Sequence, residues 1–234
     1  SSTSFVIWYI SFSFGFLKAC NVLKILIAGA GLGGLSAAAC LLQEGHDVQV
    51  FEQAPKLGEI GAGIQLSANA MHVLNHINIG EAVSAISVRP GAYVFRLFDT
   101  AEIIQEFSLA EEHLALHKAP YNQIHRADFH DLLVKRVQEL KPDCIRLNKR
   151  AVSFDETEDG VCLNFDDGTI ISGDLVVGAD GVKSVIRDQI CGPVQAVYTG
   201  DAAWRVTVPT CELPPNFIDE VRGLTSLTLA SPPL

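Results

Sequence analysis

The sequence predicts an α/β protein built around a β-α-β unit, and three consecutive segments support this. Residues 21–28 form a short apolar run, residues 35–45 have the alanine and leucine content of a helix, and residues 47–52 form a second apolar run. Gly45 stands where a helix commonly stops. Strand, helix and strand in this order build a parallel sheet with a right-handed crossover.

The composition indicates a globular chain with a core of its own. Hydrophobic residues make up 48% of the 234 residues and charged residues 19%, more apolar than a disordered chain. The 27 acidic side chains outnumber the 17 basic ones and give a formal charge of −10. This charge opposes attraction to phosphate backbones, so we expect no nucleic-acid partner.

The six cysteines are scattered, without a C-x-x-C pair or a Cys/His cluster at zinc spacing. We therefore expect no metal site and interpret the cysteines as free thiols in a reducing, cytoplasmic compartment.

Residues 1–21 form an apolar leader interrupted by serines and a glycine. This stretch is short for a membrane span and lacks the basic start of a signal peptide. We interpret it as a disordered leader or an artefact of the gene model. A membrane contact is the less favoured alternative.

The remaining chain continues the alternation of strands and helices. A glycine-rich loop over 57–67 is followed by a predicted helix over 68–77, and residues 92–107 resemble a hairpin. The apolar stripe from Arg126 to Leu140 predicts a helix. Three strand-like runs follow, over residues 144–155, 160–168 and 169–180. A helix is predicted over 182–190, and further strands over 196–208.

The most informative motif is G-x-G-x-x-G, formed by Gly29, Gly31 and Gly34 between the first strand and the helix. The first glycine permits a tight turn, the second lets a pyrophosphate approach the backbone, and the third lets helix and strand pack closely. Glu52 ends the second strand about 20 residues later, where a carboxylate accepts hydrogen bonds from a ribose. The motif predicts a dinucleotide site but does not separate FAD from NAD.

Five motifs in a fixed order resemble the class A FAD-dependent aromatic monooxygenases, in particular the salicylate hydroxylase and 6-hydroxynicotinate monooxygenase branch. The resemblance covers residues 22 to about 209 and rests on these segments: IAGAGLGGL, VFEQAP, GEIGAGIQLSANAMHVL, HRADFHDLL and DLVVGADGVKSVIR. It implies a Rossmann-like FAD-binding domain with part of an interleaved β-sheet substrate domain.

The resemblance also implies which residues hold FAD. The glycine loop with Gly33 and Arg126 would meet the pyrophosphate, and Glu52 with Gln53 the adenosine end. Gly63 and Gln65 would lie along the flavin, the backbone at Ala151 near adenine, and Asp180 with Gly181 near the ribityl or pyrophosphate region. Arg126 as a simple helix start and Asp180 as a simple helix cap are the structural alternatives.

Other candidates carry less functional information. The segment GDAAW contains Asp201, which imitates a family motif but leads into a strand, so we interpret it as a decoy. Two interpretations of Trp204 and Arg205 stay open: their side chains face a substrate cavity, or they serve core packing or a solvent-side ion pair. No catalytic base is identified, and we interpret the seven histidines as surface or packing residues.

These motifs predict a division into domains. Residues 22–91 and 118–192 would form the FAD-binding domain, 92–117 and 193–222 a partial substrate domain, and 223–234 an unassigned tail. Because the resemblance ends before a second GD segment, we expect a chain truncated at its C-terminus.

The resemblance implies an FAD-dependent monooxygenase that uses NAD(P)H and molecular oxygen to hydroxylate a small aromatic substrate. Three alternatives stay open: an FAD-dependent epoxidase of an isoprenoid, an NAD-dependent dehydrogenase, and a non-catalytic flavin-binding fragment.

Overall fold

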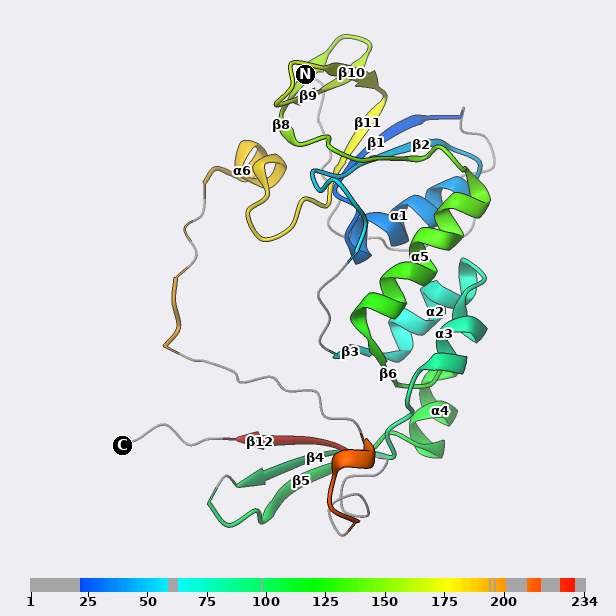
Figure 1. Cartoon of the computed structure of the whole chain (residues 1–234), viewed down its shortest axis with the longest axis vertical. Helices are drawn as coiled ribbons and strands as arrows, with labels where there is room; N and C mark the ends of the chain where they lie inside the picture. Colours follow the sequence, from blue (N-terminus) through cyan, green and yellow to red (C-terminus); the bar gives the residue numbers. More distant parts are fainter. Residues whose placement is uncertain are drawn as a thin grey trace.

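The computed structural model describes residues 22–58, 63–97, 99–193, 195, 197–200, 210–215 and 224–229. The described elements form an elongated arrangement, with a parallel sheet and its helices toward one end and a hairpin sheet toward the other (Figure 1). A short two-stranded sheet and two helices lie between these ends.

The parallel sheet confirms the predicted α/β class and the β-α-β unit. Its strands, in spatial order, are β11 (Leu175–Gly178), β1 (Lys24–Ala28), β2 (Asp47–Phe51) and β7 (Ile145–Arg146). All three pairings are parallel, with Ala28 opposite both Phe51 and Gly178. The carboxyl ends of β1, β2 and β11 therefore meet at one edge of the sheet.

Two helices, α1 (Leu32–Gln43) and α5 (Arg126–Leu140), cover one face of this sheet. The predicted bounds of α5 are confirmed. Its buried residues Phe129, Leu133 and Val137 are spaced four apart and pack in the same core as Leu35 of α1. Gly45, with φ +88°, follows the end of α1 as predicted.

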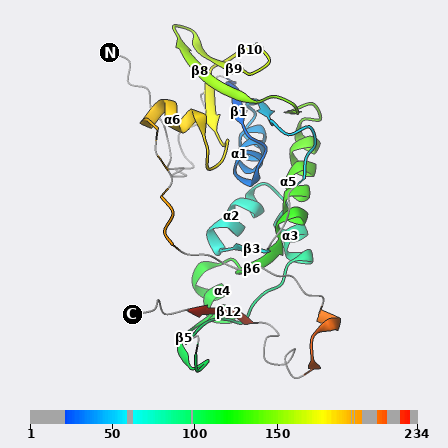
Figure 2. The same cartoon turned by 60° about the vertical axis from the view of Figure 1, so that its left-hand side comes forward.

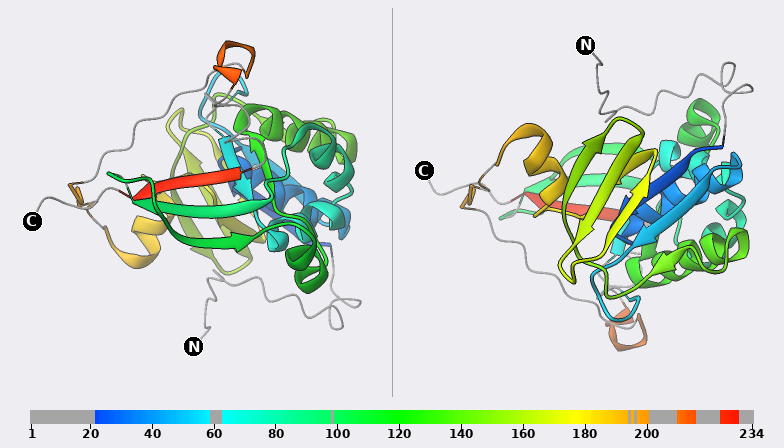
Figure 3. Two further views of the ribbon diagram at one scale, coloured as in Figure 1. Left: turned by 90° about the horizontal axis from the view of Figure 1, so that it is seen from below. Right: turned by 90° about the horizontal axis from the view of Figure 1, so that it is seen from above.

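An antiparallel sheet covers the other face (Figure 3). Its strands are β8 (Ala151–Thr157), β9 (Gly160–Phe165) and β10 (Ile170–Gly173). Phe165 packs on Phe51 of β2 with ring centroids 4.8 Å apart, within a core that also contains Leu26. The helix α6 (Val185–Cys191) lies beside β8, where the Phe154 amide donates to the Gln189 side chain at 3.0 Å.

Two of the predicted strand runs are wrong as single strands. The run over 144–155 divides into β7 and β8, because Asn148 adopts a left-handed φ of +52° between them. The run over 169–180 divides into β10 and β11. Asp174 separates them and is held by the Lys24 backbone, whose amide donates to its carboxylate at 2.6 Å. The polar residues Asn148, Lys149 and Arg150 mark the first change of sheet, and Asp174 marks the second.

The middle of the molecule contains four short elements (Figure 2), three of which are not predicted from the sequence. They are β3 (Gly63–Leu66), β6 (Asn122–His125), α2 (Ala68–His76) and α3 (Gly80–Ile86). The end of the predicted loop over 57–67 is wrong, since β3 pairs antiparallel with β6. The predicted helix over 68–77 is confirmed as α2.

The predicted hairpin is confirmed by β4 (Ala92–Leu97) and β5 (Ile103–Ser108), which pair antiparallel. The helix α4 (Glu111–His117) follows, and β12 (Leu224–Leu229) pairs parallel with β4. A short 3-10 helix, η1 (Thr210–Glu212), is also described. Most of the predicted strand region 196–208 lies outside the described residues.

Two further features concern the described part of the chain. None of its helices combines the length and apolar character that a membrane crossing requires. The five cysteines in this part are free thiols, of which Cys144 is buried and Cys191 exposed.

Candidate functional site

The glycine loop turns tightly at the edge where β1, β2 and β11 end. Gly29 has φ +104° and donates its amide to the Phe51 carbonyl at 2.7 Å. A Cβ at Gly29 would lie 2.3 Å from the carbonyl oxygen of Ala179, and one at Gly34 would lie 2.0 Å from that of Gly29. These two positions therefore require glycine for the packing of the loop itself.

The other two glycines face open space. Gly31 is the N-cap of α1, and a Cβ at Gly31 or Gly33 would meet nothing within 4 Å. No side chain caps the amides at this helix N-terminus. Uncapped amides and the helix dipole together favour an anion such as a phosphate at this position.

Glu52 joins the glycine loop to the end of β2. One carboxylate oxygen accepts from the Ala30 amide at 2.8 Å, and the other accepts from the Ala54 amide at 2.9 Å. The half-buried carboxylate lines a pocket of about 110 Å³ together with Gly31 and Lys56. The carboxylate is thus held where the sequence predicts it, beside the loop.

His130 also lines this pocket, and it was not expected from the sequence to belong to the site. It lies on α5, its side chain is almost fully buried, and Nε2 donates to the Ala30 carbonyl at 2.8 Å. Its Nδ1 is buried without a hydrogen-bond partner. The spacing of four residues from Arg126 is the signal that could have identified it, because residues four apart share a helix face.

Arg126 opens α5, on the same face as His130 and one turn before it. Its neighbour His125 pairs with Gly63 across β6 and β3, and Gln65 of β3 pairs with Gln123. The structure therefore brings Gly63 close to Arg126, while Gln65 is exposed farther along β3.

The segment before β8 lies against the residues that directly follow β2. The Lys149 amide donates to the Glu52 carbonyl at 2.9 Å, and the Asn148 amide to the Ala54 carbonyl at 3.2 Å. Ala151 follows two residues later as the first residue of β8. Gln53 lies beside Glu52 and is exposed.

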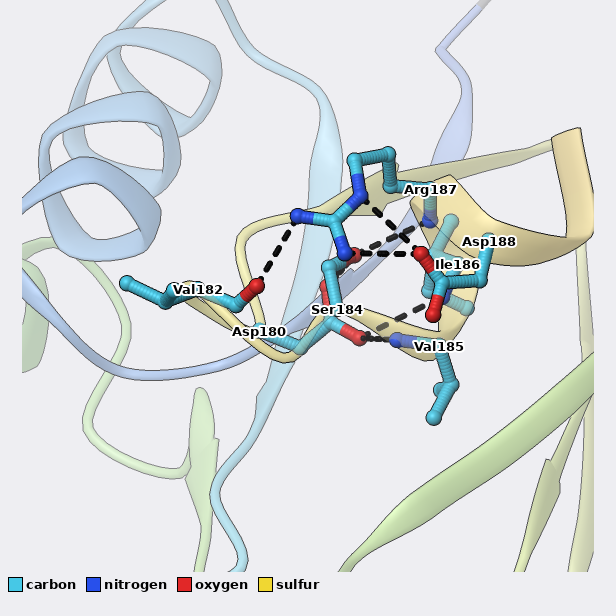
Figure 4. Close-up of polar contacts among 7 residues, drawn as sticks. All are labelled: Asp180, Val182, Ser184, Val185, Ile186, Arg187 and Asp188. Carbon is cyan, nitrogen blue, oxygen red and sulfur yellow. Dashed lines mark hydrogen bonds and ion pairs between the residues drawn. The ribbon is translucent and has the colours of Figure 1, made fainter. Parts of the chain in front are cut away.

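Asp180 caps α6, as its structural alternative suggested (Figure 4). One carboxylate oxygen accepts from the Val185 amide at 2.8 Å, and the other accepts from the Ser184 hydroxyl. Ser184 in turn accepts from the Arg187 amide at 2.9 Å. The turn nevertheless lies against the glycine loop, because Ala179 packs beside Gly29 and Gly34. Gly181 follows in the turn with φ +81°.

Most of the predicted site residues thus converge on one edge of the sheet, whereas Gly63 and Gln65 lie on the separate β3–β6 ladder and Arg126 directly follows β6. Asp201, Trp204 and Arg205 lie outside the described residues. No group of three metal-ligating side chains occurs within the described part of the chain.

Comparison with known families gives one match that covers most of the chain. Residues 22–210 match the model of a family described as "FAD binding domain".

Curated relatives include two bacterial hydroxylating enzymes. The 6-hydroxynicotinate 3-monooxygenase of Pseudomonas fluorescens is 37% identical over 191 residues, which are 81% of this chain and 49% of that protein. The 3-hydroxybenzoate 6-hydroxylase 1 of Aquipseudomonas alcaligenes is 39% identical over 191 residues, 82% of this chain and 48% of that protein. The chain thus spans about half the length of the curated relatives it matches.

Solved structures give a consistent likeness. A 2-methyl-3-hydroxypyridine-5-carboxylic acid oxygenase variant matches with a TM-score of 0.63 and 31% identity, covering 73% of this chain and 43% of that one. Klebsiella pneumoniae HpxO, solved with FAD and uric acid, matches with a TM-score of 0.61 and 30% identity, covering 71% of this chain and 41% of that one.

Proposed function

Because the chain belongs to the family of FAD-binding domains, we propose that it carries the FAD site of a monooxygenase that uses NAD(P)H and molecular oxygen to hydroxylate a small aromatic substrate. The observation that carries this proposal is the convergence of Glu52, the open Gly31 and the uncapped start of α1 on one pocket. Family membership favours FAD over NAD, which the glycine motif alone does not separate.

The residues present fit a dinucleotide. An open backbone at Gly31 and Gly33 leaves room for a pyrophosphate that any side chain at Gly31 would obstruct. Gly29 and Gly34 hold the loop in this shape, and the amides of α1 supply hydrogen-bond donors. Arg126 adds a cation whose planar guanidinium suits phosphate oxygens.

The two ends of the cofactor would meet different residues. Glu52, with Gln53 and the backbone leading to Ala151, would hold the adenosine end. Gly63 and Gln65 would lie along the flavin. Because Asp180 already caps α6 with both carboxylate oxygens, we assign the contact of that turn to the backbone at Gly181.

The bound flavin supplies the redox and oxygen chemistry of the reaction, while the protein binds and orients it and shields the substrate from water. The aromatic substrate is proposed by likeness to the hydroxylating relatives, which act on ring compounds according to their names.

FAD titration of the purified chain, followed by flavin fluorescence, tests this proposal. We expect saturable binding that Arg126→Ala weakens roughly tenfold, the effect of losing one charge-assisted hydrogen bond. Lys135→Ala is the matched control, because it removes an exposed positive charge from the same helix. A chain that is folded by circular dichroism but shows no saturable FAD binding would refute the flavin site.

If FAD binds, the second measurement is NAD(P)H oxidation stimulated by added phenols or hydroxylated aromatic acids, with oxygen consumption recorded in parallel. Oxidation without any dependence on an aromatic compound would contradict the hydroxylase assignment while leaving the flavin site intact.

A further inference from the structure

A second pocket is lined by residues from the start of α2, from α4 and from the segments beside them. It has a volume of about 400 Å³, and a cavity of roughly 150 Å³ already holds benzene. Its polar lining residues are Ser67, Asn69, His72, His113, His117 and Tyr121. The size suits one substituted aromatic ring.

Three aromatic side chains form part of the wall. The rings of His113 and His117 lie 4.5 Å apart between centroids, and Tyr121 meets His113 edge-on at 6.1 Å. Such tilted and edge-to-face arrangements are the ones that aromatic rings favour with each other. A further ring entering the pocket would find the same kind of contact.

A hydrogen bond joins the two helices that enclose the pocket. His72 of α2 donates from Nε2 to the carbonyl oxygen of His117, the last residue of α4, at 2.9 Å. This contact links residues 45 positions apart and joins the two walls in the absence of a ligand. A site that exists before binding costs less ordering of side chains when the ligand enters.

His113 brings an unused polar atom to this pocket. Its Nδ1 is buried without a hydrogen-bond partner, and burial, followed by the nearby His117, lowers the pKa of the ring. A neutral imidazole that carries its proton on Nε2 presents a lone pair at Nδ1 and accepts a hydrogen bond there. A buried polar atom without a partner is unfavourable, so a ligand donor would be stabilising.

The remaining lining favours a neutral ligand. None of the described residues that line this pocket is Lys, Arg, Asp or Glu. Burial raises the pKa of Tyr121, which therefore keeps its hydroxyl proton. A charged carboxylate would find no ionic partner among these residues, whereas a phenolic hydroxyl needs only one acceptor.

We propose that this pocket binds a neutral hydroxylated aromatic ring, whose hydroxyl donates a hydrogen bond to Nδ1 of His113. The assignment of this ring as the substrate rests on the proposed function. Ser67 of the pocket lies directly after β3, and β3 carries Gln65, which we place along the flavin. The ring would then lie close to the cofactor.

The probe is 4-nitrophenol, which is partly ionised at neutral pH and whose absorbance distinguishes the bound neutral ring from the anion, with 4-nitroanisole as the same ring without the hydroxyl proton. We expect the 234-residue chain to bind 4-nitrophenol saturably and roughly tenfold more tightly than 4-nitroanisole. This difference in affinity is what one hydrogen bond contributes. His113→Leu should remove this preference, and His113→Gln, which keeps an acceptor, should retain most of it. His46→Ala, between α1 and β2, is the control.

The outcomes separate the two proposals, because FAD binding is titrated independently on the same samples. A preference for the phenol that survives His113→Leu overturns the pocket assignment, as does a wild-type chain that binds FAD but no 4-nitrophenol. Loss of the preference in His113→Leu, with His113→Gln and His46→Ala unaffected, supports the assignment even if FAD does not bind.

Discussion

His130 and Ala30 are 100 residues apart in sequence and are joined by a hydrogen bond of 2.8 Å from the imidazole Nε2 to the carbonyl oxygen. The imidazole is 2% exposed, and the carbonyl belongs to the middle of the glycine loop. Because Arg126 lies one turn earlier on the same face of α5, this bond also fixes the position of the arginine relative to the loop.

Replacing His130 should therefore weaken both the fold and the cofactor site. His130→Ala removes a buried hydrogen bond and leaves a cavity, so we expect a loss of about 2–4 kcal/mol in the free energy of unfolding. We expect FAD affinity to fall by about tenfold. His130→Gln can place an amide donor near the position of Nε2 and should recover most of the affinity. Urea unfolding and FAD titration measure the two effects. Equal affinities of the alanine and glutamine variants would contradict the role of the hydrogen bond.

Gly34→Ala should destabilise the fold before any ligand is considered. The added Cβ would lie 2.0 Å from the Gly29 carbonyl oxygen, a backbone atom of the tight loop that has little freedom to move. We expect a loss of roughly 2–4 kcal/mol, in the range of overpacked cores. Gly33→Ala is the matched control, because Gly33 is the neighbouring residue in α1 and its added Cβ would meet nothing within 4 Å. This substitution should leave the free energy of unfolding unchanged or raise it slightly. Thermal unfolding of the two variants distinguishes packing from a general intolerance of alanine.

Gly31→Ala should weaken FAD binding and leave the stability of the fold almost unchanged. Nothing lies within 4 Å of its added Cβ, and φ is −74°, which any residue adopts, so the melting temperature should change little. The methyl group would occupy the space proposed for the pyrophosphate, so FAD affinity should fall at least tenfold. Unchanged FAD affinity in a folded Gly31→Ala chain would place the phosphates elsewhere.

The sequence predicts those parts of the fold that depend on local pattern. The helix over Arg126–Leu140 follows from its apolar stripe, and the glycine loop from its position between strand and helix. The division of 144–155 into β7 and β8 was missed, because β7 pairs with β2, a partner far away in the sequence, whereas β8 pairs with β9 directly after it. His130 was missed for a similar reason, since its bond to Ala30 depends on the packing of α5 against α1 and not on local spacing alone.

The carboxyl group of Asp167 should titrate well below its usual range. Hydrogen bonds from the Lys149 ammonium and then from Thr169 lower the pKa of Asp167 from 3.8 to about 2. A carboxylate whose pKa is lower in the folded state stabilises the fold above about pH 4, and this contribution is lost as the pH falls toward about 2. Carbon NMR titration checks the value, and Lys149→Met should return it toward 3.8. A midpoint near 3.8 in the wild-type chain would show that the Lys149 contact does not persist in solution.

Alkylation of Cys144 should report on the stability of the parallel sheet and on FAD binding. Burial raises the pKa of Cys144 to about 11, and its thiol donates to the Val48 carbonyl at 3.4 Å. Because only an accessible thiolate reacts, the thiol should react with iodoacetamide only when the sheet opens. The exposed Cys191 should react at once.

A ligand that binds only the folded state lowers the population of the open state. FAD at about 100 times its dissociation constant should therefore slow Cys144 alkylation by about a hundredfold, if opening includes the cofactor site. The rate at Cys191 should not change, and Arg126→Ala should reduce the protection at the same FAD concentration. Mass spectrometry of the two peptides measures both rates in one sample. Protection of Cys144 that is equal with and without FAD, in a chain that binds FAD, would show that the sheet opens without releasing the cofactor.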